Sequence, residues 1–520
     1  MSQLTERIHE RLAHSPLPCL YDMERWITGQ DFYRDMTIIK NMLFKAGIKP
    51  GARILLSYPN SYAFVVTYLA IIEYGAAVAP INPKMPESEF IQFLERCQPT
   101  CGFVEEQHLT LIKKNTDTSI GLTHLFLAEA MDSPLPLKTY TLSNTNWIEH
   151  SPFVSETPGD HPLPSEETVG VLLYTSGTTG NPKAVGLKHR HLLASANNII
   201  VSHQLDTTDV AYSFLPLFHI NAQVVSILST ILSGGRVVLA PKFSVRRFWP
   251  TIQEHQVTWV SAVPTIIAIL LTSDGPTQAP THLRFVRSAS AQLPMLHARR
   301  FEQKFGVPII ESYGMTEAAS QICINPIPPN KRILGSVGLP VGLDLQIVNE
   351  SNQPLAPNKV GEITIRGNNV IEYYEKADHQ NDFQEGWFHT GDLGYLDKEG
   401  YVYIVGRKKE MINVGGEKIS PYEVEDEIRK LSTVKHVAVI GLPDPLYGEK
   451  VVAYIIPTTS TVDEKVFIQD IHAHCIGALS HYKCPSEIHV VSEIPIGPTG
   501  KIQRFRLKEQ ELLRQKVDSH

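Results

Sequence analysis

The sequence is poor in cysteine, carries no surplus of positive charge and contains no long uninterrupted apolar stretch. Its 520 residues include six scattered cysteines, which form no disulfide framework and fit a reducing cytoplasmic setting. A formal net charge of −7 leaves no basic footprint for general nucleic-acid binding. No window approaches the ~18 apolar residues of a membrane-spanning helix, and the charged residues 1–16 lack the apolar core of a signal peptide. We therefore expect a soluble protein with no integral membrane segment and no nucleic-acid partner.

Histidine and cysteine gather in one C-terminal stretch, which raises the question of a metal centre. The residues are His472, His474, Cys475, His481 and Cys484. Their spacings match no zinc-binding pattern, so we do not expect a metal ion there.

The length of the chain exceeds one ordinary core, so two or more domains are expected. Residues 53–57, 63–74 and 76–80 have strand, helix and strand patterns in succession, which predict a parallel βαβ unit. The same α/β rhythm returns further on, with a predicted apolar helix at 224–232. Between these regions, residues 130–168 are rich in Pro, Ser and Thr and predict an irregular surface connection.

The last third of the chain has a different pattern. Short strands separated by polar turns, such as 361–366 and 401–405, predict an antiparallel, barrel-like region. The C-terminal residues mix strands with helices at 421–431 and 463–478, which predicts a small α+β domain. Polar residues replace the apolar run near 406–409, so the joint between domains should lie there.

A loop rich in glycine and hydroxyl side chains follows the apolar strand predicted at 169–173. It reads Tyr-Thr-Ser-Gly-Thr-Thr-Gly-Asn-Pro-Lys over residues 174–183. Glycines let a backbone approach a ligand closely, and hydroxyls, backbone N–H groups and a lysine suit a polyphosphate. The spacing is not that of the usual P-loop. The candidate phosphate-binding residues are Thr175, Ser176, Gly177, Thr178, Thr179, Gly180 and Lys183.

This loop closely resembles the phosphate loop of the adenylate-forming superfamily, which includes acyl-CoA synthetases, adenylation domains of peptide synthetases and beetle luciferases. Other segments resemble further signatures of that superfamily, and they occur in the expected order. They lie at residues 215–219, 288–293, 311–317, 387–393, 403–410, 413–421 and 495–502. The resemblance covers roughly residues 50 to 505 and implies a large α/β domain followed by a small mobile domain.

The segment Glu-Ser-Tyr-Gly-Met-Thr-Glu at 311–317 is where the resemblance implies adenine and metal binding. Tyr313 would stack on adenine beside Ser312 and Gly314, and Thr316 would contact the α-phosphate. Glu317 would hold Mg²⁺, with Thr178 as a second metal ligand. An aromatic face suits a purine, and a hard carboxylate suits Mg²⁺.

The resemblance assigns the ribose to Asp392, which would accept hydrogen bonds from both hydroxyls, and to Arg407, which would also reach the phosphates. The backbone at Ala289 and Ser290 would lie against adenine. These two residues depart from the superfamily's usual Ser-Gly-Ala-Ala-Pro-Leu, so the acyl pocket wall is expected to be slightly narrower and more polar.

The remaining implied roles concern the acyl and thiol channels and the movement of the small domain. His219 would gate access to both channels, and Lys409 would be the hinge. Gly415 and Gly416 would line the pantetheine tunnel, although without the resemblance this pair predicts only a turn. Lys501 would be the catalytic lysine, whose ammonium neutralises charge that develops between the carboxylate and the α-phosphate.

The resemblance thus implies a large ATP- and acyl-binding domain at 1–406, a hinge at 407–409 and a small domain at 410–520 that carries the lysine and the CoA-tunnel segment. The implied enzyme is an ATP-dependent acyl-CoA synthetase. A carboxylate and ATP give acyl-AMP and pyrophosphate, and CoA then gives acyl-CoA and AMP. The expected ligands are a small-molecule carboxylic acid, ATP, Mg²⁺ and coenzyme A.

Two alternatives remain open at this point. An adenylating enzyme of the same superfamily could load a carrier-protein thiol in place of CoA. A non-catalytic nucleotide-binding protein could be built on the same fold, although the retained Lys501, Glu317 and Asp392 argue against it. The sequence does not name the carboxylic acid, and it leaves a homo-oligomer open.

Overall fold

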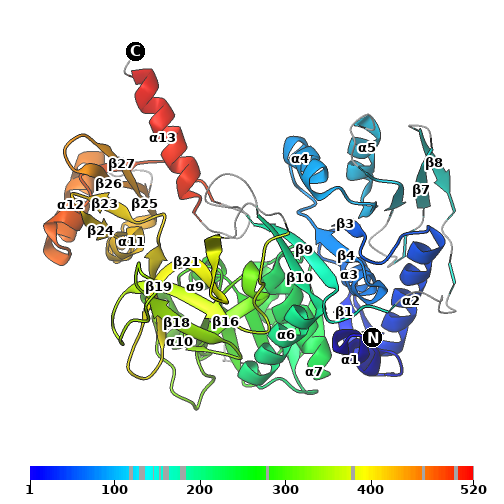
Figure 1. Cartoon of the computed structure of the whole chain (residues 1–520). Helices are drawn as coiled ribbons and strands as arrows, with labels where there is room; N and C mark the ends of the chain where they lie inside the picture. The colour runs from blue at the N-terminus through cyan, green and yellow to red at the C-terminus, as the bar shows by residue number, and fades with distance from the viewer. Residues whose placement is uncertain are drawn as a thin grey trace.

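The computed structural model describes residues 1–115, 121–127, 135–136, 138–143, 146–151, 154–155, 163–175, 183–276, 280–375, 381–459, 463–496 and 502–518. Two large sheets with their helices form the N-terminal part, an antiparallel sheet follows, and a small α+β unit lies at the C-terminal end (Figure 1). This arrangement agrees with the fold class that the sequence predicts.

The first sheet has nine strands in the described residues, and its central strands run parallel. Its order is β17 (Leu339–Pro340), β16 (Ser320–Ile324), β15 (Ile309–Met315), β14 (Phe285–Ser288), β13 (Trp259–Ala262), β11 (Val210–Ser213), β12 (Arg236–Leu239), β1 (Pro18–Asp22) and β2 (Arg25–Thr28). Because β11 to β15 are parallel, their carboxyl ends meet at one edge, where α/β sheets usually bind ligands.

The second sheet has eight strands in the described residues. Its order is β10 (Lys183–Lys188), β9 (Val169–Thr175), β4 (Ala77–Pro80), β3 (Arg53–Ser57), β5 (Cys101–Val104), β6 (His124–Leu127), β7 (Lys138–Ser143) and β8 (Asn146–His150). The prediction of an irregular connection over 130–168 is wrong where β7 and β8 pair antiparallel. β8 is mostly exposed, so its polar residues carried no strand pattern, and backbone pairing at the sheet edge decided the structure.

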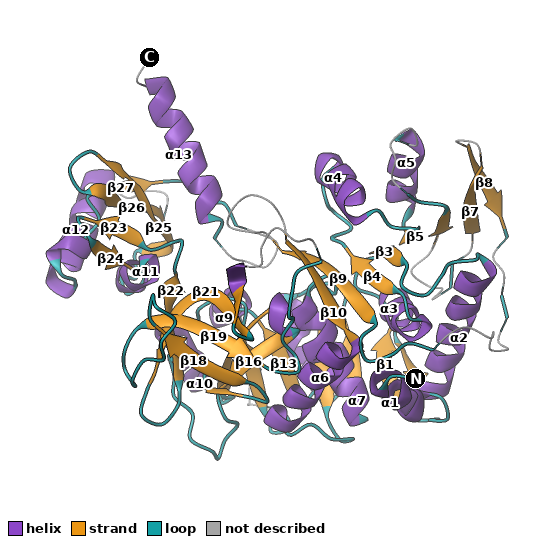
Figure 2. Ribbon diagram, in the orientation of Figure 1, coloured by secondary structure: helices purple, strands orange, loops and turns teal. Residues whose placement is uncertain are grey.

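Helices cover both large sheets (Figure 2). They are α1 (Gln3–Leu12), α2 (Gly29–Lys45), α3 (Tyr62–Tyr74), α4 (Glu87–Cys97), α5 (Glu106–Lys114), α6 (His189–His203), α7 (Ser229–Ser233), α8 (Val245–Glu254), α9 (Pro264–Thr272) and α10 (Met295–Phe305). α3 is buried along its whole length because it contacts β3, β4 and β9 as well as α2. It begins after the N-cap Ser61 and ends at Gly75, whose φ of 83° closes the helix.

The predicted helix at 224–232 is a different structure. A π-helix, η1 (Asn221–Leu228), begins three residues earlier and continues into α7. The residues are apolar on all sides because the segment is buried, so their pattern could not distinguish the wider π-helical turn from an α-helix.

The third sheet is the antiparallel region that the sequence predicts. Its strands are β18 (Asp344–Val348), β19 (Gly361–Arg366), β20 (Phe383–Gln384), β21 (Trp387–Leu396) and β22 (Val402–Arg407). A short 3-10 turn, η2 (Thr316–Ala318), follows β15.

The small C-terminal unit, coloured orange and red in Figure 1, has its own sheet and its own core. Its elements are β23 (Ile412–Val414), β24 (Glu417–Ile419), α11 (Pro421–Ile428), β25 (Val434–Asp444), β26 (Gly448–Pro457), α12 (Glu464–Ala478), η4 (His481–Lys483), β27 (Glu487–Val490) and α13 (Arg504–Asp518). β25 and β26 are apolar on both faces because α11 and α12 cover one face and α13 covers the other.

Polar contacts join the small unit to the rest of the chain. Gln292 donates to Asp426 at 2.9 Å, and Lys418 pairs with Glu350 at 2.9 Å. Ser420 Oγ also donates to the Val405 carbonyl at 2.6 Å. An interface of this polar kind resembles those across which domains move.

None of the helices in the described ranges combines the length and apolar character that a bilayer crossing requires. Across the same ranges, no three His, Cys, Asp or Glu residues come together in a way that could hold a metal ion. The histidine and cysteine stretch of the small unit is included in that finding.

Candidate active site

The candidate phosphate loop connects two strands of the second sheet. Thr175 ends β9 and Lys183 begins β10, and the two residues are paired across the antiparallel ladder. Both are half-buried. Ser176, Gly177, Thr178, Thr179 and Gly180 lie outside the described residues, as does Lys501.

Three candidate nucleotide-binding residues converge from separate strands. Tyr313 on β15 donates its hydroxyl to Asp392 Oδ2 at 2.5 Å, although 79 residues separate the two in sequence. Arg407 Nε lies 3.0 Å from Asp392 Oδ1, because β21 and β22 pair these residues directly. Asp392 is buried, and its charge raises the pKa of Arg407. The carboxylate is therefore fixed in position through both of its oxygens.

Glu317 lies buried just after β15 in the short turn η2. Burial raises the pKa of its carboxyl group, while the charges of Arg407 and Lys183 oppose that rise. The Tyr374 hydroxyl donates to Glu317 Oε1 at 3.3 Å. This acid thus combines deep burial with nearby positive charge, as expected for a group that meets a charged ligand.

Lys183 is held by an acidic residue that the sequence analysis missed. Its ammonium forms an ion pair with Asp382 and lies 4.7 Å from the centre of the Tyr374 ring. The Tyr374 hydroxyl is also 3.4 Å from Asp382. Lys183, Tyr374, Asp382 and Glu317 therefore form one network. An isolated acid five positions before the Trp387 segment gave no sequence signal.

The residues around Tyr313 are fixed by strand packing. A Cβ atom at Gly314 would lie 1.7 Å from the Ser320 carbonyl oxygen, so the pairing of β15 with β16 requires glycine there. Ser312 is buried and donates to the Cys323 carbonyl at 2.8 Å. Thr316 is half-buried at the start of η2. Tyr313 in β15 and Thr316 at the start of η2 thus lie three residues apart on one segment.

The segment after β14 lies beside the start of the π-helix. Ala289 is buried, and its N–H donates to the Ala262 carbonyl at 3.2 Å. Ser290 has a φ of 74°, which non-glycine residues rarely adopt, and Asn221 Nδ2 lies 3.5 Å from its Oγ. His219, just before η1, is half-buried with its ring 4.4 Å from that of Phe218.

The candidate hinge and tunnel residues follow Arg407 in the chain. Lys409 is exposed in the turn between β22 and β23. Gly415 and Gly416 have φ values of 60° and 96° and form the two-residue turn between β23 and β24. In Figure 1 these two strands lie apart from β9 and β10. The turn explains the glycines locally, and its two strands lie away from the strands that flank the candidate phosphate loop.

Arg287 is a second residue that the sequence analysis missed. It lies on β14 with an exposed fraction of 1%. Its guanidinium donates to Asn221 Oδ1 at 3.0 Å, to Ser261 Oγ at 3.3 Å and to Ser312 Oγ at 2.9 Å. Burial lowers its pKa to about 9. The sequence feature that could have revealed Arg287 is a charged residue directly after the apolar pair Phe-Val of a predicted buried strand.

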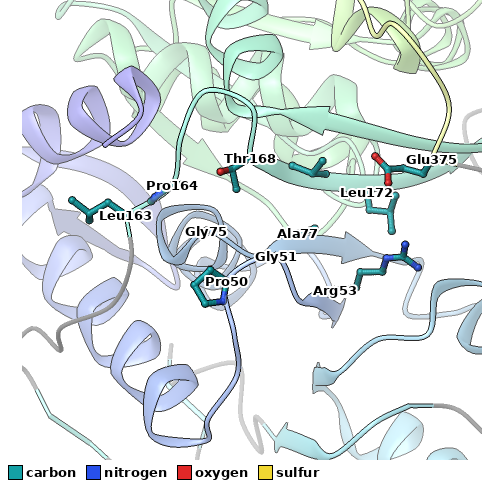
Figure 3. A pocket seen from close by; sticks show the side chains of 11 residues that line it. Pro50, Gly51, Arg53, Gly75, Ala77, Leu163, Pro164, Thr168, Leu172 and Glu375 are labelled. Carbon is teal, nitrogen blue, oxygen red and sulfur yellow. The ribbon is translucent and has the colours of Figure 1, made fainter.

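The pocket in Figure 3 lies elsewhere, with a volume of about 340 Å³. Arg53 and Glu375 are its charged lining residues, and Pro50, Pro164 and Leu172 are among its apolar ones. None of the predicted site residues lines it.

Comparisons with known proteins agree with this geometry. The model of the AMP-binding enzyme family matches residues 10–375, and that of the AMP-binding enzyme C-terminal domain matches residues 423–501. The chain is 36% identical to the sulfoacetate–CoA ligase of Cupriavidus necator, over 89% of this chain and 88% of that one. It is also 36% identical to the oxalate–CoA ligase of Arabidopsis thaliana, over 90% of each chain.

Two solved structures show the same architecture. ATP-bound MatB from Rhodopseudomonas palustris superposes with a TM-score of 0.87 and 25% identity, covering 98% of this chain and 99% of that one. The o-succinylbenzoate coenzyme A synthetase of Bacillus subtilis, in complex with ATP and magnesium ion, has a TM-score of 0.81 and 26% identity, covering 96% and 99%.

Proposed function

The chain belongs to the AMP-binding enzyme family, and from this premise we propose roles for its site residues and a class of acid substrate. The predicted superfamily is confirmed, and so is the predicted activity: the protein is an ATP-dependent acyl-CoA synthetase. ATP, Mg²⁺ and coenzyme A are its ligands. The proposals that follow concern individual residues.

The proposal for the nucleotide site rests on Asp392, because both of its carboxylate oxygens are already held by neighbouring side chains. We assign it the ribose hydroxyls, with Tyr313 against adenine and Arg407 toward the phosphates. The hydroxyl of Tyr313 and the guanidinium of Arg407 fix the carboxylate before ATP arrives. A preset acceptor loses little conformational entropy on binding.

Glu317 fits a role in holding Mg²⁺. It is a buried carboxylate that accepts a hydrogen bond from the Tyr374 hydroxyl through Oε1, and two carboxylate oxygens leave acceptor capacity for a hard cation. Bound Mg²⁺ would neutralise charge on the phosphates. Thr178 is proposed as the second ligand.

Lys183 would exchange one anion for another when ATP binds. In this structure the Lys183 ammonium pairs with Asp382. The family resemblance implies that the same ammonium binds a phosphate of ATP. The ion pair keeps the lysine at the base of the phosphate loop and directed toward Tyr374. A polyphosphate with greater negative charge can then displace the carboxylate.

In the first half-reaction, a substrate carboxylate oxygen bonds to the α-phosphorus of ATP and pyrophosphate leaves. We assign Lys501 and Thr316 to the charge that develops on the α-phosphate. Positioning and electrostatics supply most of the rate in such transfers. In the second half-reaction, the CoA thiolate sulfur bonds to the acyl carbon and AMP leaves.

The small unit is proposed to rotate between the two steps about Lys409. Three observations support this: Lys409 is exposed in a turn, the interface between the units is polar, and the strands β23 and β24 lie away from β9 and β10, which flank the phosphate loop. Rotation would carry that glycine turn to the thiol channel, which His219 would gate.

The proposed substrate is a short, polar carboxylic acid. The relatives named above act on sulfoacetate and oxalate, and polar side chains gather here around β13, β14 and the start of η1: Asn221, Ser261, Arg287 and Ser290. A long alkyl chain offers no acceptor to Arg287 Nε, which has no hydrogen-bond partner among the described residues, and an unpaired donor is costly in a buried site.

A panel of acids tests the proposal, with pyrophosphate release and CoA-dependent thioester formation measured separately. Short polar acids should be activated with a higher kcat/KM than acids of eight or more carbons. A preference for the long acids would refute the substrate class. Acyl-AMP formation without any CoA thioester would instead favour a carrier-protein thiol as the acceptor.

A further inference from the structure

Arg287 is a buried cation without an anionic partner in the described residues. The three oxygens that accept from its guanidinium belong to Asn221, Ser261 and Ser312, and all are neutral. Its Nε makes no hydrogen bond to any residue that the structure describes. Burying an unpaired charge opposes folding, so such groups are retained mainly where they serve another purpose.

Arg504 shows how the same chain stabilises a buried arginine for structural purposes. It is the other arginine of the described ranges that is fully buried, with an exposed fraction of 8%. Its guanidinium pairs with Glu425 at 2.6 Å and with Glu410 at 3.2 Å. Arg287 has no such carboxylate, so its compensating charge must come from outside the described residues.

The polar groups around Arg287 lie at the ligand-binding edge of the first sheet. Ser261 is on β13 and Arg287 on β14, each next to the last residue of its strand, and Ser312 on β15 directly follows the part of that strand that pairs with β14. Ser261 and Arg287 are register partners, so their side chains share one face of the sheet. The Ser312 hydroxyl accepts from the guanidinium, so Arg287 reaches the strand that also carries Tyr313.

Asn221 links this group to the proposed acyl pocket. It is the first residue of the π-helix η1, and π-helical turns are frequent at functional sites. Its Oδ1 accepts from Arg287, while its Nδ2 faces Ser290 at 3.5 Å. The side chain therefore bridges the cation and the segment assigned to the acyl wall.

We propose that Arg287, supported by Asn221 and Ser261, binds a second anionic group of the substrate, either a carboxylate or a sulfonate. The carboxylate at the opposite end of the same acid is the one that is adenylated. This inference rests on the proposed function and narrows its substrate class to short dianionic acids. The planar guanidinium can donate two parallel hydrogen bonds to such a group. The second anionic group of the substrate would neutralise the positive charge of Arg287.

Replacement of Asn221 by aspartate is the most direct test, because it changes charge with little change in shape. In N221D a carboxylate would face Arg287 permanently and compete with the substrate's second anion. We expect kcat/KM to fall by about tenfold or more for malonate, oxalate and sulfoacetate, and to stay within about threefold for propionate and pyruvate. The new ion pair should leave the melting temperature unchanged or raise it.

Arg287→Gln removes the cation itself. The wild-type protein should prefer at least one dianionic acid over its monoanionic counterpart by about 30-fold or more, and R287Q should lose that preference. Arg284→Gln is the matched control, because Arg284 directly precedes the same strand but pairs with Asp209 at 2.6 Å. R284Q should lower the melting temperature without altering the ratio between the two classes of acid.

The outcomes separate this inference from the proposed function. No pyrophosphate release with any acid would refute the proposed substrate class. Release with monoanionic acids and no preference for dianionic ones would refute the role of Arg287 alone. A more stable N221D protein with unchanged selectivity would show that Arg287 is structural.

Discussion

Replacing Asp392 by alanine should weaken ATP binding by about 10- to 100-fold. Hydrogen bonds to a charged group contribute ~1.5–3 kcal/mol each, and 1.4 kcal/mol is a factor of ten in affinity. Two ribose hydroxyls could in principle double that value. However, both carboxylate oxygens are already engaged: one accepts a hydrogen bond from Tyr313 at 2.5 Å, and the other forms an ion pair with Arg407 at 3.0 Å. The ribose must share these oxygens, so the loss of about one charge-assisted bond is expected.

The variant Asp392→Asn separates the contribution of the carboxylate charge to ATP affinity from that of the acceptor oxygens. The amide keeps one acceptor oxygen but loses the charge, so ATP affinity should fall by less, about three- to tenfold. The melting temperature should fall in both variants, because the buried Tyr313 hydroxyl and Arg407 lose an acceptor. Asp344→Ala is the control: Asp344 lies in the same sheet and forms an exposed ion pair with Arg366 at 2.9 Å, which contributes little.

Isothermal titration of each folded variant with ATP provides the measurement, with circular dichroism as the folding control. Asp344→Ala should bind ATP with wild-type affinity. If Asp392→Ala keeps its fold and binds ATP as tightly as the wild-type protein, Asp392 does not contact the nucleotide, and the assignment of the ribose site is refuted.

Four further substitutions test the other assignments. Glu317→Ala should impair adenylation more at low than at saturating Mg²⁺, because a lost ligand can be offset by mass action; equal impairment at every Mg²⁺ concentration would contradict a metal-binding role. Lys501→Ala should slow adenylation by at least ~10²–10³-fold but form thioester from synthetic acyl-AMP and CoA at a near wild-type rate; equal slowing of both steps would argue against domain rotation. Lys409→Pro should spare adenylation and impair thioester formation, because proline fixes φ and restricts the preceding residue; normal rates in both half-reactions would remove Lys409 as the hinge. Asp382→Asn should tighten ATP binding by about two- to tenfold in a titration, the scale of one net hydrogen bond, because Lys183 no longer has to leave a carboxylate; unchanged or weaker binding would show that the ion pair does not compete with ATP.

The sequence by itself determined the local elements and the chemistry that each segment can offer. Helix α3 followed from the continuous apolar pattern at 63–74, and the structure has it within one residue of the expected bounds. The order of the motifs identified the superfamily correctly, because each motif is contiguous and its chemistry is carried by neighbouring residues. Such features depend on local propensity and on side-chain type, both of which the sequence states directly.

Tertiary structure decided which distant groups meet. Tyr313 reaches Asp392 across 79 residues, and Lys183 reaches Asp382 across 199, because sheet order and strand pairing bring their elements together. The sequence analysis did not identify Arg287, and only packing shows that it is buried among neutral partners. The sequence analysis also missed the π-helix at Asn221 and the pairing of β7 with β8. Backbone hydrogen bonds define both features, and one side-chain pattern is compatible with several backbone hydrogen-bond arrangements. Convergence of this kind arises from the packing of the whole chain, whereas the sequence specifies only the residues that can take part.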